Sequence, residues 1–384
     1  MAGISLKGLF LLALLAPAGC GAPPPPSSAS AKSAPPEQLN RIVERYWDER
    51  QPLQNAISPQ DLADSLSIER RYLADVLRLP REGLDEDSRL TYDIFKRQRE
   101  QAIEGLTFPE ELLPINPYEG MTQRLVESAQ AGKPLTAADC EDWLKRIDEY
   151  VRWTRQAIAN MREGVRRGYT SPRALIERML PILEGLGADG PGNVLNTPLH
   201  SIPESINEGE RSRLTKAISN ATAQELLPAI RVLYDYLKHE YLPRARVGMA
   251  LSDLPLGPRW YAYRVKRAVG LSAAPEEIYR IGVAQVERLG VQSQASQPET
   301  PNVAQPGAAE LVSAYKDLAD KVRTVLPDLF TEAPKEDLDI RAMVWPLEPA
   351  TPLYYRRAGP AGVPPAVLYV DIARGGARGV VVPN

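Results

Sequence analysis

The chain has 384 residues, of which 43% are hydrophobic and 25% charged, the composition of an ordinary globular protein rather than a disordered or fibrous one. Its formal net charge is -3 and no long basic run interrupts it, so nucleic acid is excluded as an expected partner. The length exceeds what a single core usually holds, so we expect one elongated domain or two subdomains.

The first twenty residues have the pattern of an export signal. Lys7 precedes an apolar run, residues 9–15, that is too short to cross a bilayer, and Ala18-Gly19-Cys20 follows. This ending resembles the signal of bacterial lipoproteins, in which the cysteine becomes the first mature residue and carries the lipid. We therefore expect residues 1–20 to be removed, Cys20 to be lipidated, and the protein to be exported and membrane-anchored in the periplasm or at the cell surface. A plain cleaved signal peptide is the alternative.

Residues 21–38, GAPPPPSSASAKSAPPEQ, predict a flexible Pro/Ser-rich tether that holds a folded body away from a membrane. Only two cysteines are present, so lipidation of Cys20 leaves Cys140 without a partner and excludes a disulfide framework. Cys140 lies in the first turns of a predicted helix, and we expect its thiol to be buried and inert.

Most of the remaining chain has the apolar spacing of helices. Two are bounded by clear signals: Ser58-Pro59 starts the segment 58–79, and Thr136 with Asp139 starts the segment 136–168, which Gly168 ends. Further helices are predicted at 85–106, 171–187, 222–243, 274–290 and 310–330. The core stripe is predicted from Leu62, Leu66, Leu73, Val76 and Leu77 in the first segment, from Leu90, Ile94, Phe95, Ile103 and Leu106 in the second, and from Leu144, Ile147, Val151, Ile158, Met161 and Val165 in the third.

The segment 222–243 is predicted to begin with a capping box formed by Thr222 and Glu225. Residues 291–309, rich in Gln, Pro and Ser, predict a low-complexity surface loop. Residues 340–346 and 366–373 have the β-branched and aromatic content of strands, so we expect 340–384 to form an incomplete strand layer. The predicted fold is a mainly α multi-helix scaffold, residues 39–384, with a few short β-strands near the C-terminus.

Two segments of the chain match part of the residue pattern of a functional motif but lack the neighbouring residues or elements that the motif requires. His239-Glu240 begins as a zinc-protease motif does, but Pro243 stands where the second histidine is needed, and the only other histidine is His200. The segment 185–190, GLGADG, matches a dinucleotide fingerprint but follows a predicted helix, so we interpret it as a helix end. Neither motif predicts a metal or nucleotide site.

One stretch, residues 234–289, carries a family resemblance: YDYLKHEYLPRARVGMALSDLPLGPRWYAYRVKRAVGLSAAPEEIYRIGVAQVERL. It resembles the bacterial family called domain of unknown function 885, in which a helix ending YL..AR leads to an LP.G...Y turn and a further helix. The resemblance extends to 167–180, 314–330 and the strand AVLYVDIA, and covers nearly the whole mature chain.

Members of that family look like zinc peptidases whose metal is held by a His-Glu-x-x-Pro-Gly-His-His helix beyond this strand. The resemblance implies zinc for the full-length family. No stretch of this chain matches that helix, so no catalytic, cofactor-binding or metal residue is carried over. Tyr261, after Gly257 in the turn, and Tyr369, on the strand, are the weak candidates for a substrate cleft, with ordinary packing as the alternative.

The expected function is that of an exported lipoprotein resembling the N-terminal part of a zinc metallopeptidase, catalytically inactive as written and containing no cofactor. The alternatives are a non-catalytic envelope binding or scaffold lipoprotein, whose helical cleft binds a peptide or a partner, and a pairing with another polypeptide that supplies the zinc half. The membrane, through the lipid anchor, is the expected partner.

Overall fold

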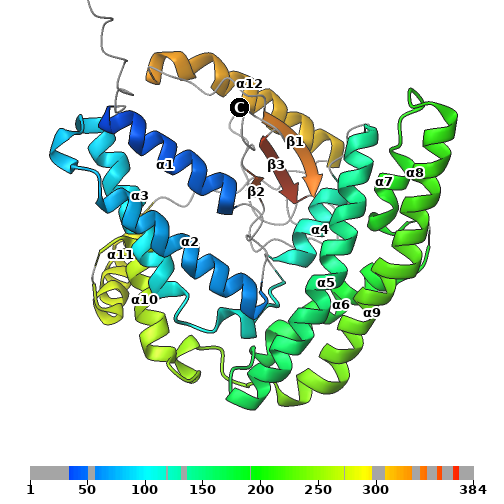
Figure 1. The fold of residues 1–384 in the computed structure, drawn as a ribbon, viewed down its shortest axis with the longest axis horizontal. Coiled ribbons are helices and arrows are strands. Elements are labelled where there is room, and N and C mark those ends of the chain that lie inside the picture. The colour runs from blue at the N-terminus through cyan, green and yellow to red at the C-terminus, as the bar shows by residue number, and fades with distance from the viewer. Residues whose placement is uncertain are drawn as a thin grey trace, which may run out of the picture.

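The computed structural model describes residues 34–50, 57–117, 120–130, 136–190, 192–271, 273–295, 308–330, 338–343, 353–356 and 366–371. This part of the chain is mainly α-helical, as predicted, with three short strands near its end (Figure 1). The α-helices are α1 (Pro35–Arg50), α2 (Pro59–Leu77), α3 (Glu86–Gly105), α4 (Met121–Ala129), α5 (Ala137–Arg167), α6 (Arg173–Gly187), α7 (Thr197–His200), α8 (Glu208–Ala221), α9 (Leu227–Asp235), α10 (Gly257–Val269), α11 (Pro275–Ala295) and α12 (Ala308–Leu329).

The predicted helix ends are confirmed where the sequence supplies a complete cap. The Ser58 hydroxyl accepts from the Asp61 amide at 3.1 Å, and the Asp61 carboxylate accepts from the Ser58 amide at 3.2 Å. Thr136 and Asp139 form the same reciprocal pair at the start of α5, and Gly168 ends that helix with a φ of 79°. Each such cap contributes about 1 kcal/mol to helix stability, which explains why these boundaries are well defined.

The capping box predicted at Thr222 is wrong. Thr222 is buried and helical, because α8 continues through a π-helical segment, Thr222–Leu226, directly into α9. Pro228 lies just beyond this segment and has no amide hydrogen to donate to the preceding turn. A wider π turn accommodates the proline ring without ending the helix. A second π segment, Tyr236–Tyr241, precedes Pro243 in the same way.

The ends of two predicted irregular segments are helical in the structure. Helix α1 begins at Pro35, so the last four residues of the predicted tether, 35–38, belong to a helix rather than to a linker. Residues 291–295 and 308–309 of the predicted loop belong to α11 and α12, and 296–307 lie outside the described residues. Residues 1–33, with the predicted signal and Cys20, also lie outside them.

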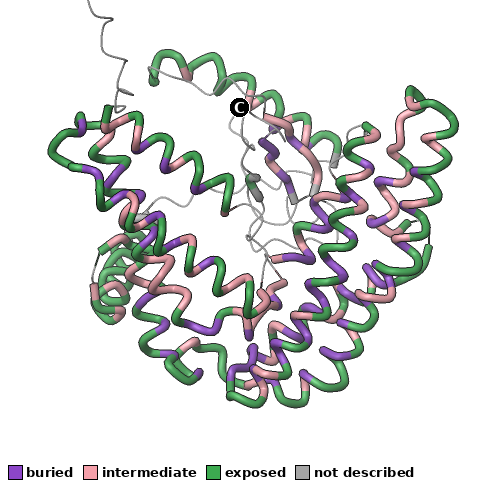
Figure 2. The backbone as a smooth tube through the Cα atoms, viewed as in Figure 1, coloured by how far each residue is buried: buried purple, intermediate pink, exposed green. Residues whose placement is uncertain are grey.

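The larger hydrophobic core lies among α4, α5, α6, α8 and α9 on one side of the molecule, where Figure 2 shows buried residues recurring along the length of α5. Its fully buried side chains include Tyr150, Ile147, Met161, Ile176 and Leu183. Cys140 is also buried there as a free thiol, as predicted, and its burial raises the pKa of that thiol. Gly187 ends α6, and its carbonyl accepts from Arg231 at 2.8 Å, so the GLGADG segment is a helix end as interpreted.

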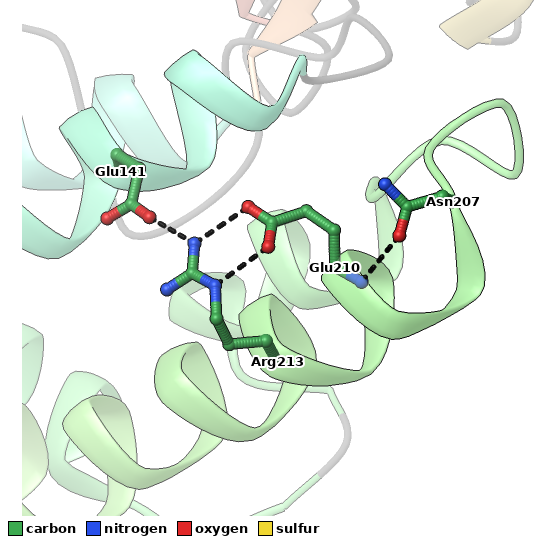
Figure 3. Close-up of polar contacts among 4 residues, drawn as sticks. All are labelled: Glu141, Asn207, Glu210 and Arg213. Carbon is green, nitrogen blue, oxygen red and sulfur yellow. Dashed lines mark hydrogen bonds and ion pairs between the residues drawn. The ribbon is translucent and has the colours of Figure 1, made fainter.

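Helix α8 is also connected to α5 at the surface (Figure 3). Arg213 on α8 forms ion pairs with Glu210 on its own helix at 2.8 Å and with Glu141 on α5, while Asn207 caps the helix by accepting from the Glu210 amide at 2.9 Å. All three charged groups are exposed to solvent, so these pairs contribute little to stability, and the two helices are held together by the apolar side chains beneath them.

A smaller core holds α1, α2 and α3 together on the opposite side (Figure 1). The buried face of α2 agrees with the predicted stripe at Val76 but not at Leu77, which is half exposed, and its other buried residues are Ser65, Glu69 and Tyr72. On α3 the buried residues are Tyr92, Phe95 and Arg99, while Leu90 and Ile94 are exposed. Two charged residues, Glu69 and Arg99, therefore lie inside this core. In α5, by contrast, Ile147, Val151, Ile158 and Met161 are buried as predicted.

A third apolar cluster joins the two sides. The Phe108 ring, just after α3, stacks on Trp260 of α10 with centroids 5.6 Å apart and planes within 8°. Leu112, Tyr169, Leu254 and Tyr263 complete the cluster. Gly164 of α5 lies so close to this cluster that a side chain there would meet the backbone carbonyls of Tyr169 and Leu112. The junction is thus made of close backbone contacts as well as aromatic packing.

The strands are β1 (Leu338–Met343), β2 (Leu353–Arg356) and β3 (Ala366–Asp371), and they form one sheet in the order β1-β3-β2. Two of them, β1 and β3, correspond to the predicted strands; β2 was not predicted. β3 pairs in parallel with β1 and antiparallel with β2. Helix α12 packs on this sheet through Leu311 and Tyr315. None of the described helices is both long enough and apolar enough to cross a membrane.

Candidate functional cleft

The two histidines do not meet in the structure. His200 is exposed at the end of α7, and His239 is exposed in the π segment that follows α9. Glu240 pairs instead with Arg162 of α5 at 2.9 Å, on the outer surface. Among the residues that the structure describes, no three His, Cys, Asp or Glu side chains gather in a group that could hold a metal ion. The similarity of His239-Glu240 to a zinc motif therefore has no counterpart in the described geometry.

An open cleft of about 1020 Å³ lies between the α1–α3 unit and the rest of the molecule. One wall comes from α1, α2 and α3, and the other from the connection 106–116, the start of α4, the end of α5 and α10. Aromatic side chains line it on both sides, among them Tyr46, Trp47, Tyr169 and Tyr263. A cleft of this size and mixed lining is the usual form of a small-molecule or peptide site.

A buried ion cluster stands in the wall formed by the first three helices. Glu69 of α2 is 2% exposed and accepts from the Tyr46 hydroxyl of α1 at 2.9 Å. The Arg99 Nε atom of α3 lies 2.6 Å from one Glu69 oxygen and the Arg50 Nε atom of α1 lies 3.4 Å from the other. The cluster therefore connects all three helices through one carboxylate. Two cations face a single anion, which leaves an excess positive charge at this wall.

Aromatic rings fix the position of Arg99. Its guanidinium lies 3.6 Å from the centroid of Tyr46 and 4.6 Å from that of Phe95. Tyr46 in turn makes edge-to-face contacts with Tyr72 and Phe95, both at 5.4 Å. Stacking on aromatic faces suits the planar guanidinium better than an ammonium group, so a lysine would not replace this arginine. The positive group at this wall is therefore held in one orientation before any ligand arrives.

Burial also affects two titratable groups of the cleft. It raises the pKa of Tyr46 to about 12, and the neighbouring Glu69 carboxylate acts in the same direction. It raises the pKa of Glu111, in the opposite wall, although Arg167 opposes that change. The phenol of Tyr46 thus remains a hydrogen-bond donor to Glu69 throughout the neutral range.

Part of the cleft rim is a strained turn. Leu256 has a φ of 58°, a left-handed conformation that is unusual for a residue with a side chain, and it lines the cleft half exposed. Gly257 follows it, and a side chain at Gly257 would collide with the Leu251 carbonyl. This turn starts α10 and sets the direction in which Tyr263 enters the cleft. Strained residues of this kind gather at binding sites, where surrounding structure holds them in place.

Neither of the two tyrosines that the sequence suggested for a substrate cleft lines this cleft. Tyr261 lies on α10 rather than in the turn; it is half exposed and does not line the cleft. Tyr369 is buried on β3 and is not part of the cleft lining either. It is Tyr263, two residues beyond Tyr261 on the same helix, that lines the cleft. A role for Tyr261 or Tyr369 with a substrate stays a prediction.

Sequence reasoning missed Glu69 and Arg99, although the chain contains a signal for both. Glu69 precedes Tyr72 by three positions and Val76 by seven, so it lies on their helix face. Arg99 follows Phe95 by four and Tyr92 by seven. When two helices each carry a charged residue at helical spacing from aromatic residues, and the two charges are of opposite sign, the pattern indicates a buried ion pair.

The fold and the cleft define a mainly helical protein with an open cleft between two packed units. The comparisons place it more closely: residues 44–379 match the family model described as "Bacterial protein of unknown function (DUF885)", and the chain belongs to that family. No curated protein matches it. A similar solved structure is that of "the putative lipoprotein from Colwellia psychrerythraea", with 14% identity, a TM-score of 0.66, and coverage of 88% of this chain and 68% of that one. At this identity the likeness shows the fold alone.

Proposed function

We propose that this protein is an exported, lipid-anchored member of its family whose cleft binds peptides, and that its 384 residues do not hydrolyse them by a zinc mechanism. The observation that carries the proposal is the cleft itself, about 1020 Å³, lined by aromatic side chains on both walls and by the Arg50–Glu69–Arg99 cluster. Aromatic rings supply apolar contact area for peptide side chains, and fixed polar groups supply orientation.

A zinc mechanism needs a metal to activate water and usually three protein ligands to hold it. The 384 residues contain two histidines, and neither stands in a His-Glu-x-x-Pro-Gly-His stretch. We therefore expect the purified protein to contain no stoichiometric zinc and to leave peptides uncut. Metal analysis and a peptidase assay on the same sample test this; zinc at one equivalent together with turnover would contradict it.

Peptide binding is tested by passing an N-acetylated random pentapeptide library over the immobilised protein and identifying the retained peptides by mass spectrometry. Gln98 is exposed on α3 and lines the cleft, so Gln98→Trp should fill part of it and reduce retention at least tenfold. Thr91→Trp places the same side chain on an exposed position of the same helix away from the cleft and should not reduce retention. Equal retention by both variants would exclude the cleft as the binding site.

The proposed membrane anchor depends on Cys20, and it is supported by the solved structure of similar fold, which is described as a "putative lipoprotein". Metabolic labelling with an alkyne fatty acid should mark the wild type and leave Cys20→Ser unlabelled. Cys140→Ser is the matched control, because the thiol of Cys140 is buried and should not carry lipid. Labelling that persists in Cys20→Ser would contradict the anchor.

A further inference from the structure

The buried ion cluster in the cleft wall contains more positive than negative charge. Glu69 is the one carboxylate that faces both Arg50 and Arg99 in the described residues, at 3.4 and 2.6 Å. Arg99 and Glu69 form an ion pair, but their contact does not have the geometry of a hydrogen bond. The Nη1 atoms of both arginines have less than 1 Å² of exposed surface, and no described residue accepts a hydrogen bond from either. Burying a donor in this state costs free energy, because the donor loses its hydrogen bonds to water and gains no acceptor in the protein.

Both arginines line the cleft, and they do so at different depths. The Arg99 side chain is 5% exposed and lies against the Tyr46 ring, whereas the Arg50 side chain is 24% exposed at the end of α1. Arg50 is therefore the group that a ligand would meet first, with Arg99 fixed behind it. The two guanidinium groups carry one more charge than the Glu69 carboxylate neutralises, and they have hydrogen-bond donors without an acceptor. A second carboxylate would supply both the missing negative charge and the missing acceptors.

The rest of the cleft does not cancel this charge. Besides Glu69, its acidic residues are Glu110, which pairs with Arg264 outside the cleft lining, and Glu111, in the wall that also contains Arg167. The cleft is therefore suited to an anionic ligand. A peptide is the proposed occupant of the cleft, and the anionic group that a peptide supplies is a carboxylate, whose planar shape matches the fork of a guanidinium group.

We propose that Arg50 and Arg99 bind a carboxylate of the peptide that occupies the cleft, with Glu69 and Tyr46 holding the two guanidinium groups in place. This inference rests on the proposed peptide binding and adds its chemical specificity. The carboxylate can be the C-terminus of the peptide or an acidic side chain. Arg50 and Arg99 would contact the ligand, while Glu69 and Tyr46 are positioning residues.

The test uses the random pentapeptide library in two N-acetylated forms, one with a free C-terminal acid and one with a C-terminal amide. We expect the wild type to retain the acid form at least tenfold more than the amide form. Arg50→Gln should remove that preference, and Arg71→Gln, a change on α2 outside the cleft, should not. Melting curves of each variant verify that it is folded. Arg50→Lys, which keeps the charge but loses the planar fork, should restore part of the preference.

The outcomes separate the two proposals. If amide peptides that contain Asp or Glu are retained to the same extent as the acid peptides, and the other amide peptides are not, the carboxylate comes from a side chain and the inference stands. If acid and amide forms are retained equally, whatever their acidic content, peptide binding stands and the carboxylate site is overturned. If neither form is retained, both are overturned. Displacement of the acid library by inorganic phosphate at concentrations where acetate has no effect would also contradict a carboxylate site.

Discussion

The hydroxyl of Tyr263 donates to the backbone carbonyl of Gln101 at 2.8 Å and lies directly against Gly105, so the end of α3 is fixed to α10 where the two walls of the cleft meet. Lys266 and Glu104 add an ion pair at 2.8 Å across the same contact. A side chain at Gly105 would collide with the Tyr263 hydroxyl. The junction therefore depends on a glycine at this position for space.

Gly105→Ala should destabilise the protein by roughly 1–3 kcal/mol, the usual cost of overpacking a close contact. Denaturant unfolding measures this. Tyr263→Phe alone should cost about 1 kcal/mol through the lost hydrogen bond. The double variant should be more stable than the sum of the two effects predicts, because the phenylalanine removes the atom that the new methyl group would meet. Strict additivity would contradict this packing relationship.

Removing the carboxylate of the buried cluster should have a far larger effect than removing a surface one. Glu69→Ala leaves Arg99, buried and fixed on Tyr46, without its counter-ion, and should destabilise the protein by about 3–5 kcal/mol. Asp142→Ala breaks an exposed pair with Lys145 on α5 and should leave the unfolding midpoint unchanged. Similar midpoints for the two variants would contradict the burial of the cluster.

The protein should lose stability at alkaline pH through its buried tyrosines. Burial raises the pKa of Tyr150 from 10.0 to about 12. Between these values the unfolded chain releases the phenolic proton and the folded chain keeps it, so unfolding becomes more favourable as pH rises from about 10 to 12. The contribution is present below pH 10 and amounts to roughly 2–3 kcal/mol for this group. Unfolding at pH 9 and pH 11.5 should show a smaller loss for Tyr150→Phe than for the wild type. Equal losses would contradict the prediction.

Helix α11 presents an apolar face to solvent. Tyr279, Val283, Val286 and Leu289 lie on this face, with Tyr279 72% and Val286 71% exposed. A surface of this kind should bind a solvatochromic apolar dye. Val286→Lys should reduce the dye fluorescence at least twofold, whereas Val247→Lys, at an exposed loop position away from α11, should leave it unchanged. Equal fluorescence from the wild type and Val286→Lys would show that the dye binds elsewhere.

The sequence predicted those parts of the fold in which local chemistry and tertiary packing agree. The capping residues of α2 and α5 and the apolar stripe of α5 are of this kind. The stripes of α2 and α3 were predicted only in part: Val76 and Phe95 are buried as predicted, but Leu77, Leu90 and Ile94 are exposed. The buried positions also include Glu69 and Arg99, and a hydrophobicity pattern assigns charged residues to the surface. Helix α1 was missed beside a proline-rich segment, although Leu39, Ile42 and Tyr46 have helical spacing.

The cleft could not be predicted at all from spacing within single helices. It is built where α1, α2, α3, α5 and α10 converge, and the pairing of Arg99 with Glu69, thirty positions apart, depends on how α2 and α3 pack. Tyr261 and Tyr263 are both aromatic and only two positions apart, so the sequence offered no reason to prefer the one that lines the cleft. The orientation of α10, which begins directly after the strained turn at Leu256, decides which of the two tyrosines lines the cleft.

Backbone hydrogen–deuterium exchange, followed by mass spectrometry with and without a saturating retained peptide, tests peptide binding in the cleft most directly. Binding there should slow exchange in residues 98–116 and in 256–267, which line its two walls, and should leave α8 and α9 unchanged. Slower exchange confined to α8 and α9, or no change in either wall at saturation, would contradict the cleft as the functional site.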